Sequence, residues 1–284
     1  MTKMLCAIEW NPSAELFSIG SFAVRYYSFW WLVGLVAAYF LLKYLYKQQQ
    51  LSDKDFDSLV VYSFIGIFVG ARLGHFMFYD PEYFITRPLE IILPIARDAA
   101  GKYHFVGYAG LASHGGTLGL MLALWMYARK TGINLWQTLD NIAIATPITA
   151  CCIRLGNFWN SEIIGNATGS DWGIIFTQVD NVARHPSQLY EAIAYIIIFV
   201  VGLLIYKCLD SKLHRGFYFG FCLTAIFTAR FFIEFSKVNN GIFEDFALNT
   251  GHYLSVPFIA LGLFCMFYRK VGSFELGTVK KKLR

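Results

Sequence analysis

Three arginines lie within long apolar runs of the sequence, at Arg72, Arg154 and Arg230. Placing an arginine at the depth of a lipid bilayer costs about 2.5–3.5 kcal/mol on insertion scales, so its presence indicates a function. The guanidinium group is planar and permanently charged, and it binds phosphate through paired hydrogen bonds. These residues therefore predict a binding site for an anion, with a phosphate group as the best match.

Further polar residues accompany the arginines at helical spacing. They form three pairs whose members are three or four residues apart: Arg154 with Asn157, Gln188 with Glu191, and Arg230 with Glu234. Residues at this spacing lie on one face of a helix. The alternative to a binding site is that the carboxylates only neutralise arginines inside a helix bundle. Burying so many charges for packing alone is costly, which favours a site.

His114 is the best candidate for a general base, because histidine titrates near neutral pH. It lies in Ser113-His114-Gly115-Gly116, where the glycines permit close approach of another backbone or an unwound helix start. A lone histidine is more commonly a hydrogen-bonded structural residue. Neighbouring arginines that change its proton affinity would favour the catalytic role, and His75 and His185 are weaker candidates.

The composition indicates a protein that crosses a membrane several times. Of its 284 residues, 56% are hydrophobic and only 15% are charged, whereas soluble domains carry about a quarter charged residues. Apolar runs long enough to span a bilayer occur at residues 28–46, 57–79, 110–128, 137–158, 187–206, 216–236 and 253–268. We therefore predict an all-α integral membrane protein with seven transmembrane helices.

The distribution of lysine and arginine predicts the orientation of the chain. With the N-terminus outside, the inner segments carry more of these residues in much less length than the outer segments. The basic tail 269–284 is then cytoplasmic, and the outer loops are residues 80–109 and 159–186, which we expect to form a small external cap. We expect one polytopic membrane domain over residues 1–284. All the polar residues named above, with Tyr27, then fall in the outer half of the bilayer.

Other classes of partner and cofactor are disfavoured. The net charge of +5 comes mainly from basic residues at the ends of apolar runs, which is a topology signal and predicts no nucleic-acid partner. The six cysteines form no CxxC pair and no zinc spacing, so we predict no metal and no cofactor. The N-terminal segment lacks the continuous apolar stretch of a removable signal peptide.

Four multi-residue motifs occur in one order along the chain. They are Ser113-His114-Gly115-Gly116, Arg154-Leu155-Gly156-Asn157-Phe158-x-Asn160-x-Glu162-x-x-Gly165, His185-Pro186-Ser187-Gln188-Leu189-Tyr190-Glu191 and Arg230-Phe231-Phe232-Ile233-Glu234-Phe235. With shorter matches at residues 17–20, 70–74 and 254–257, they resemble the signature of the bacterial prolipoprotein diacylglyceryl transferases. The resemblance covers nearly the whole chain, which makes it specific.

The resemblance implies an enzyme of the bacterial plasma (inner) membrane whose active site lies toward the outer face. Such enzymes move the diacylglyceryl group of phosphatidylglycerol onto the thiol of the lipobox cysteine in a prolipoprotein, and they release glycerol 1-phosphate. The acceptor cysteine belongs to the substrate, so no cysteine of this chain needs to be reactive. We expect the enzyme to act as a monomer.

The resemblance to this family, together with the chemistry of the residues, suggests roles for individual residues. We predict His114, Arg154 and Arg230 as catalytic residues: the histidine as the base for the thiol, and the arginines as ligands of the phosphate that stabilise the leaving group. Predicted to bind the substrate are Tyr27, Arg72, Arg154, Asn157, Glu162, Gly165, Gln188, Glu191 and Glu234. Tyr27 and Asn157 are candidates for hydrogen bonding, and Glu162 is expected to orient an arginine.

Some residues differ from the family's usual pattern, at Ser28, His75 and Trp159, and these differences concern the shape of the pocket rather than its charge. The main alternative function is a phospholipid or anion transporter with an outer-leaflet arginine site. A transporter predicts polar residues in the inner halves of the helices, yet residues 32–41 and 193–204 are almost uniformly apolar. An intramembrane protease is disfavoured because the chain has no HExxH or GxSxG motif and no pair of intramembrane aspartates.

Overall fold

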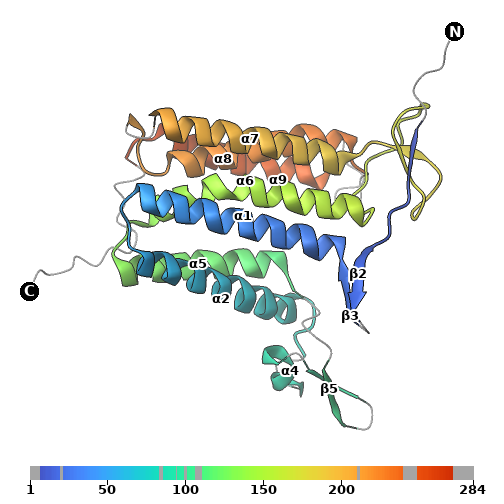
Figure 1. The fold of residues 1–284 in the computed structure, drawn as a ribbon, viewed down its shortest axis with the longest axis horizontal. Coiled ribbons are helices and arrows are strands. Elements are labelled where there is room, and N and C mark those ends of the chain that lie inside the picture. Colours follow the sequence, from blue (N-terminus) through green and yellow to red (C-terminus); the bar gives the residue numbers. More distant parts are fainter. Residues whose placement is uncertain are drawn as a thin grey trace, which may run out of the picture. The chain divides into compact units, whose positions relative to one another are not determined.

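A computed structural model of the chain describes residues 7–19, 22–82, 86–93, 95–98, 101–105, 111–209, 212–238 and 248–270. Residues 271–284 of the expected cytoplasmic tail lie outside this range. Long helices dominate the described residues (Figure 1), namely α1 (Tyr26–Gln48), α2 (Asp53–Phe78), α5 (Ser113–Thr131), α6 (Leu135–Trp159), α7 (Ser187–Leu209), α8 (Phe217–Ile233) and α9 (Thr250–Phe267). The prediction of a mainly helical membrane protein is confirmed.

Six helices of the described chain are long and apolar enough to cross a membrane. They are α1, α2, α6, α7, α9, and α8 together with the short 3-10 turn η2 (Glu234–Ser236) that follows it. The expected span at residues 110–128 corresponds to α5, which is not among them; this helix has 19 residues and begins with polar residues and glycines. The number of seven spans therefore stays a prediction.

Helix α2 begins four residues before the apolar run that predicted it. The hydroxyl of Ser52 accepts a hydrogen bond from the backbone N–H of Asp55 at 3.1 Å, which satisfies a donor of the first helical turn. Asp53 and Asp55 also place negative charge at the positive end of the helix. Polar capping residues thus extend the helix beyond its apolar part, and a hydropathy pattern does not detect them.

Residue contacts divide the chain into two compact units, which we call unit 1 (residues 1–45 and 139–274) and unit 2 (residues 46–138 and 275–284). The core of unit 1 includes a cluster of Cys151, Ala192, Tyr195 and Ile198 between α6 and α7, with residues of α8 packed against it. The carboxylate of Asp140 on α6 accepts hydrogen bonds from the backbone N–H groups of Gly216 at 2.6 Å and Phe219 at 2.8 Å. It therefore caps the start of α8 from a neighbouring helix.

A small sheet in unit 1 packs on the end of α6. Strand β1 (Ile8–Trp10) runs parallel to β6 (Ile174–Phe176), which pairs with the antiparallel β7 (Ala183–Arg184). Phe158, Ile174 and Phe176 form its core, and the indole of Trp10 donates a hydrogen bond to the carbonyl oxygen of Phe158 at 3.1 Å. This sheet uses part of the segment 159–186, and the external cap expected there stays a prediction. Strands β2 (Glu15–Ile19) and β3 (Phe22–Arg25) form a hairpin that leads into α1.

In unit 2, glycines bring α2 and α5 together backbone to backbone. A Cβ atom on Gly115 or Gly119 of α5 would overlap the carbonyl oxygen of Gly70 or Gly66 on α2. The close approach expected from the glycine that follows His114 is confirmed. Small residues at such spacing are the usual means by which membrane helices pack closely. Unit 2 also contains α4 (Pro88–Ile92) and the hairpin of β4 (Ile95–Arg97) and β5 (Tyr103–Phe105).

We predict that Gly115→Ala destabilises unit 2 and that Gly116→Ala does not. A methyl group at Gly115 has no space, whereas at Gly116 the nearest atom, the Cβ of Ala71, is 3.4 Å away. Overpacking of this kind costs about 1–3 kcal/mol, which should lower the melting temperature of the purified protein in detergent by several degrees. Equal melting temperatures for the two variants would contradict the proposed packing.

Candidate functional site

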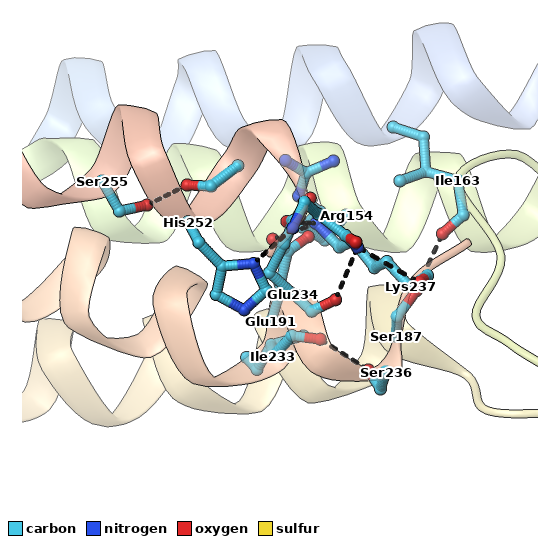
Figure 2. Close-up of polar contacts among 12 residues, drawn as sticks. Arg154, Ile163, Ser187, Glu191, Ile233, Glu234, Ser236, Lys237, His252 and Ser255 are labelled. Atoms are coloured by element: carbon cyan, nitrogen blue, oxygen red, sulfur yellow. Dashed lines mark hydrogen bonds and ion pairs between the residues drawn. The ribbon is translucent and has the colours of Figure 1, made fainter. Parts of the chain in front are cut away.

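Four charged residues of unit 1 form a buried cluster (Figure 2). The Nε of Arg154 lies 2.6 Å from Oε2 of Glu191, and the Nζ of Lys237 lies 2.8 Å from the other oxygen, Oε1. Lys237 also lies 3.4 Å from Oε2 of Glu234. Glu191 is completely buried, so its charge is tolerated because each carboxylate oxygen faces a cation.

The members of this cluster come from the ends of three helices. Arg154 lies near the end of α6, Glu191 is in the first turns of α7, and Glu234 begins η2 directly after α8. Sequence reasoning missed Lys237, because it lies one residue beyond the apolar run 216–236. Its position three residues after Glu234, which is helical spacing, was the signal that could have found it.

A chain of hydrogen bonds leads from this cluster to the surface. The Nη1 of Arg154 donates to Oδ1 of Asn157 at 3.1 Å, and Nδ2 of Asn157 donates to Oε2 of Glu162 at 3.2 Å. Asn160 donates to the other oxygen of Glu162 at 3.1 Å. Asn157 is buried and Glu162 is exposed. Glu162 is thus linked to Arg154 through Asn157, and its expected role in orienting an arginine stays a prediction.

The loop that carries Glu162 has a strained backbone. Ser161 and Ile163 have positive φ angles of 53° and 55°, which are unusual for residues other than glycine and especially for a β-branched one. The buried amide of Gln188 donates to the carbonyl oxygen of Glu162 at 2.6 Å, and Ser187 donates to that of Ile163 at 2.8 Å. Strain of this kind persists where the surroundings enforce it, and it is common at functional sites. The amide nitrogen of Gln188 therefore positions Glu162.

Gly165 ties the ends of the same three helices together. Its N–H donates to the carbonyl oxygen of His185, before α7, at 3.0 Å, and the N–H of Asn166 donates to that of Ser236 in η2 at 2.7 Å. A Cβ atom at Gly165 would overlap both of these carbonyl oxygens. The relative positions of Arg154, Glu191 and Glu234 thus depend on a backbone crossing that only glycine permits.

Arg184 reinforces this crossing from the side of the small sheet. Its Nη1 donates to the carbonyl oxygen of Gly165 at 3.2 Å, and its Nε and Nη2 hold the carboxylate of Asp180 at 3.0 and 2.5 Å. The hydrogen bonds from Arg184 lower the pKa of Asp180 below its ordinary value. The pair therefore remains ionised at neutral pH.

Arg230 joins the cluster through a tyrosine. The hydroxyl of Tyr195 lies within electrostatic range of Glu191, Arg154 and Arg230, so the two arginines lie near the same buried side chain. The guanidinium of Arg230, which is only partly buried, makes no hydrogen bond or ion pair with another described residue. Sequence reasoning also missed Tyr195, although it lies four residues after Glu191, on the same face of α7.

When the exposed Glu162 is left out, the described part of this cluster carries more positive than negative charge. Three cations, Arg154, Arg230 and Lys237, stand against the buried carboxylates of Glu191 and Glu234. An excess cation in a region of low polarity attracts an anionic ligand. Since the guanidinium of Arg230 has no partner among the described residues, it is the group best placed to bind one.

Tyr27 lies beside this site. The ring of Tyr27 packs against Gly156, where a Cβ atom would be 3.0 Å from its Cδ2. Its hydroxyl interacts electrostatically with both Glu162 and Arg154. The structure therefore brings together seven of the predicted residues in unit 1 directly around the cluster, with Gly165 as their backbone support: Tyr27, Arg154, Asn157, Glu162, Glu191, Arg230 and Glu234.

His114 and Arg72 belong to unit 2. His114 is exposed at the start of α5, and its predicted approach to the arginines stays a prediction. Arg72 is buried; its Nε and Nη2 donate to the carbonyl oxygens of Ile91 at 3.1 Å and Glu90 at 2.7 Å. Its guanidinium also lies over the ring of Phe76, 4.6 Å from the centroid. These contacts explain an intramembrane arginine without a ligand, and a role of Arg72 in substrate binding stays a prediction.

Comparison with known proteins identifies the family. The family model described as prolipoprotein diacylglyceryl transferase matches residues 14–268. The chain belongs to this family. It is 51% identical to the phosphatidylglycerol–prolipoprotein diacylglyceryl transferase of Bacteroides fragilis over 94% of this chain and 97% of the relative. Proteins of the same name from Tolumonas auensis and Chloroherpeton thalassium are 41% and 37% identical, over 90% and 92% of this chain and 95% and 93% of each relative.

We predict that Gly165→Ala strongly reduces the activity of this family member by displacing the helix ends that carry Arg154 and Glu191. The added methyl group would push apart the segments of His185 and Ser236. Gly202→Ala, in the middle of α7, is the matched control, because its nearest neighbour is 3.6 Å away. Transfer activity should fall by about a hundredfold for the first variant, as for other small displacements of reacting groups, and stay near wild type for the control. Normal activity of Gly165→Ala would contradict the role of the crossing.

Proposed function

We propose that this protein transfers the diacylglyceryl group of phosphatidylglycerol to the thiol of the lipobox cysteine of a prolipoprotein. The relatives that carry the name of this activity support the substrate pair. The observation that carries the proposal is that Arg230 lies within electrostatic range of Tyr195 and the ion-paired Arg154, and makes no hydrogen bond or ion pair with another described residue. A phosphatidylglycerol head group carries one negative charge, on its phosphate, and a guanidinium group can bind this phosphate.

The proposed reaction is a displacement at a glyceryl carbon. A base removes the proton of the substrate thiol, whose ordinary pKa of about 8.5 leaves little thiolate at neutral pH. The thiolate sulfur forms a bond to the glyceryl carbon that carries the phosphate oxygen, and the bond between this carbon and that oxygen breaks. The electron pair leaves with glycerol 1-phosphate, and the guanidinium groups of Arg154 and Arg230 stabilise its growing negative charge.

The remaining residues of the cluster hold the guanidinium group of Arg154 in position for the lipid. Glu191 and Asn157 hold the Nε and Nη1 of Arg154, so the orientation of its guanidinium is fixed before the lipid binds. We assign Tyr27 and Glu162 to hydrogen bonding with the polar part of the head group, because Tyr27 interacts with both Glu162 and Arg154. Two neighbouring arginines could also bind the substrate of an anion transporter, but the activity named for the relatives favours the transferase.

We further propose that the site opens toward the outer face of the bacterial inner membrane, with the N-terminus outside and the C-terminal tail in the cytoplasm. The distribution of basic residues supports this orientation. The protein then acts as a monomer, and the lipid enters from the bilayer between helices.

The proposed reaction predicts two products from the purified protein. Mixed with phosphatidylglycerol and a lipobox peptide, it should release glycerol 1-phosphate and increase the mass of the peptide by one diacylglyceryl group. Replacing the peptide cysteine by serine should abolish both signals. Arg230→Gln should reduce transfer by about a hundredfold or more, as does the loss of other groups that stabilise a developing charge. Absence of any mass gain with the wild-type protein would refute the proposed function.

The assignment of His114 as the base makes a separate prediction. His114→Ala should lower kcat by about a hundredfold, the usual contribution of a general base. A substrate peptide whose thiol has a lower pKa should recover part of this loss, since it needs the base less. If His114→Ala retains nearly full activity while Arg154→Ala has none, the arginines activate the thiol and the assignment of the base is wrong.

A further inference from the structure

We propose that Lys237 is a positioning residue that sets the net charge of the head-group site. This inference rests on the proposed function. Lys237 neutralises the carboxylates behind the arginines, so that the arginines keep their charge for the phosphate of the lipid. Neither the motifs of the sequence nor the reaction itself requires a lysine at this position, and the proposal comes from the geometry around its ammonium group.

The ammonium group of Lys237 is buried and bridges two carboxylates. The residue is 6% exposed, and its Nζ lies 2.8 Å from Oε1 of Glu191 and 3.4 Å from Oε2 of Glu234 (Figure 2). A lysine head group is compact and carries three donors, which suits it to bridging. It also lies away from solvent, so water does not screen these interactions.

The backbone of Lys237 is fixed as firmly as its side chain. Its N–H donates to the carbonyl oxygen of Glu234 at 3.1 Å, and the residue forms a bridge to Gly165, the glycine that ties the helix ends together. The side-chain amide of Asn249 donates to the carbonyl oxygen of Lys237 at 3.4 Å. A residue held in this way keeps its charge at a fixed place beside Glu191.

A count of charges shows what this lysine does for the site. With Lys237, the described cluster has three cations and two buried carboxylates, and one positive charge is left for a ligand. Without it, Arg154 and Arg230 would face Glu191 and Glu234, and the cluster would be neutral. The two carboxylates would then compete with the phosphate for the two arginines. This count covers the buried carboxylates only; Glu162 is exposed, and among the described residues its carboxylate accepts hydrogen bonds from Asn157 and Asn160 and not from an arginine.

A structural role explains only part of this arrangement. Lys237 is the ion-pair partner of the buried Glu234 at 3.4 Å. Glu191, however, already has a partner in Arg154 at 2.6 Å, so the contact of Lys237 with Glu191 adds a cost of desolvation. This free-energy cost is explained if the extra positive charge serves to bind an anion. Because Lys237 also neutralises Glu191, that carboxylate compensates less of the charge of Arg154, and Arg154 can attract the phosphate from its fixed position.

The proposal is tested with three variants of the full-length protein: Lys237→Met, Lys237→Arg and the double variant Lys237→Met with Glu234→Gln. The first makes the cluster neutral, the second retains its charge, and the third restores one positive charge by removing a carboxylate. We would measure binding of a short-chain phosphatidylglycerol, with phosphatidylcholine of the same chain length for comparison. We would also measure KM and kcat for lipid and peptide, and the melting temperature of each variant.

We expect Lys237→Met to weaken phosphatidylglycerol binding and to raise the lipid KM by about tenfold, with a change below about twofold in the peptide KM. Lys237→Arg should bind phosphatidylglycerol within about threefold of wild type, and the double variant should regain most of the binding that Lys237→Met loses. A Lys237→Met protein that binds the lipid normally would overturn the proposal, even if its melting temperature falls. So would a double variant that regains its melting temperature but not its lipid binding, because that pattern indicates a merely structural ion pair.

The binding measurement does not depend on the reaction. If the wild-type protein binds phosphatidylglycerol but transfers nothing to the peptide, the proposed function fails while the role of Lys237 is still decided by binding. If the wild-type protein binds phosphatidylcholine as tightly as phosphatidylglycerol, the charge of the site does not select the lipid and the proposal for Lys237 is overturned.

Discussion

The carboxylate of Glu191 is the group on which the polar centre of this protein depends. It is completely buried, and it is compatible with the apolar interior only because Arg154 and Lys237 occupy its two oxygens. Each of the three residues comes from the end of a different helix or the turn that follows it. Since a buried charge without a partner is very costly, this requirement fixes how the helix ends approach one another.

The backbone around Gly165 also holds the helix ends close together, through hydrogen bonds rather than ion pairs. Strand-like hydrogen bonds join the segment after α6 to the residues before α7 and to η2, and glycine is needed where these segments cross. The neighbouring residues Ser161 and Ile163 adopt strained conformations that Ser187 and Gln188 hold in place. The rigid frame and the strained loop together keep a charged cluster in one arrangement before any ligand is present.

The two units use intramembrane arginines in different ways. In unit 2, the Nε and Nη2 of Arg72 donate to backbone carbonyl groups, and its guanidinium lies over the ring of Phe76. In unit 1, Arg154 is held by side chains, and Arg230 has no hydrogen-bonding partner among the described residues. The cost of placing an arginine in a membrane is thus met by internal contacts in one case, and in the other we propose that a lipid phosphate meets it.

The sequence by itself determined the helical membrane class and the pairs at helical spacing, because hydropathy and the spacing of residues are local properties of a chain. It also determined the family, because the motifs have the residue types, the spacing and the order along the chain that the family shows. Only the tertiary structure decided that Lys237 and Tyr195 belong to the cluster and that Arg72 binds backbone carbonyls. These contacts join residues that are distant in sequence. Burial and ion pairing depend on such tertiary contacts, and a local sequence pattern cannot predict them.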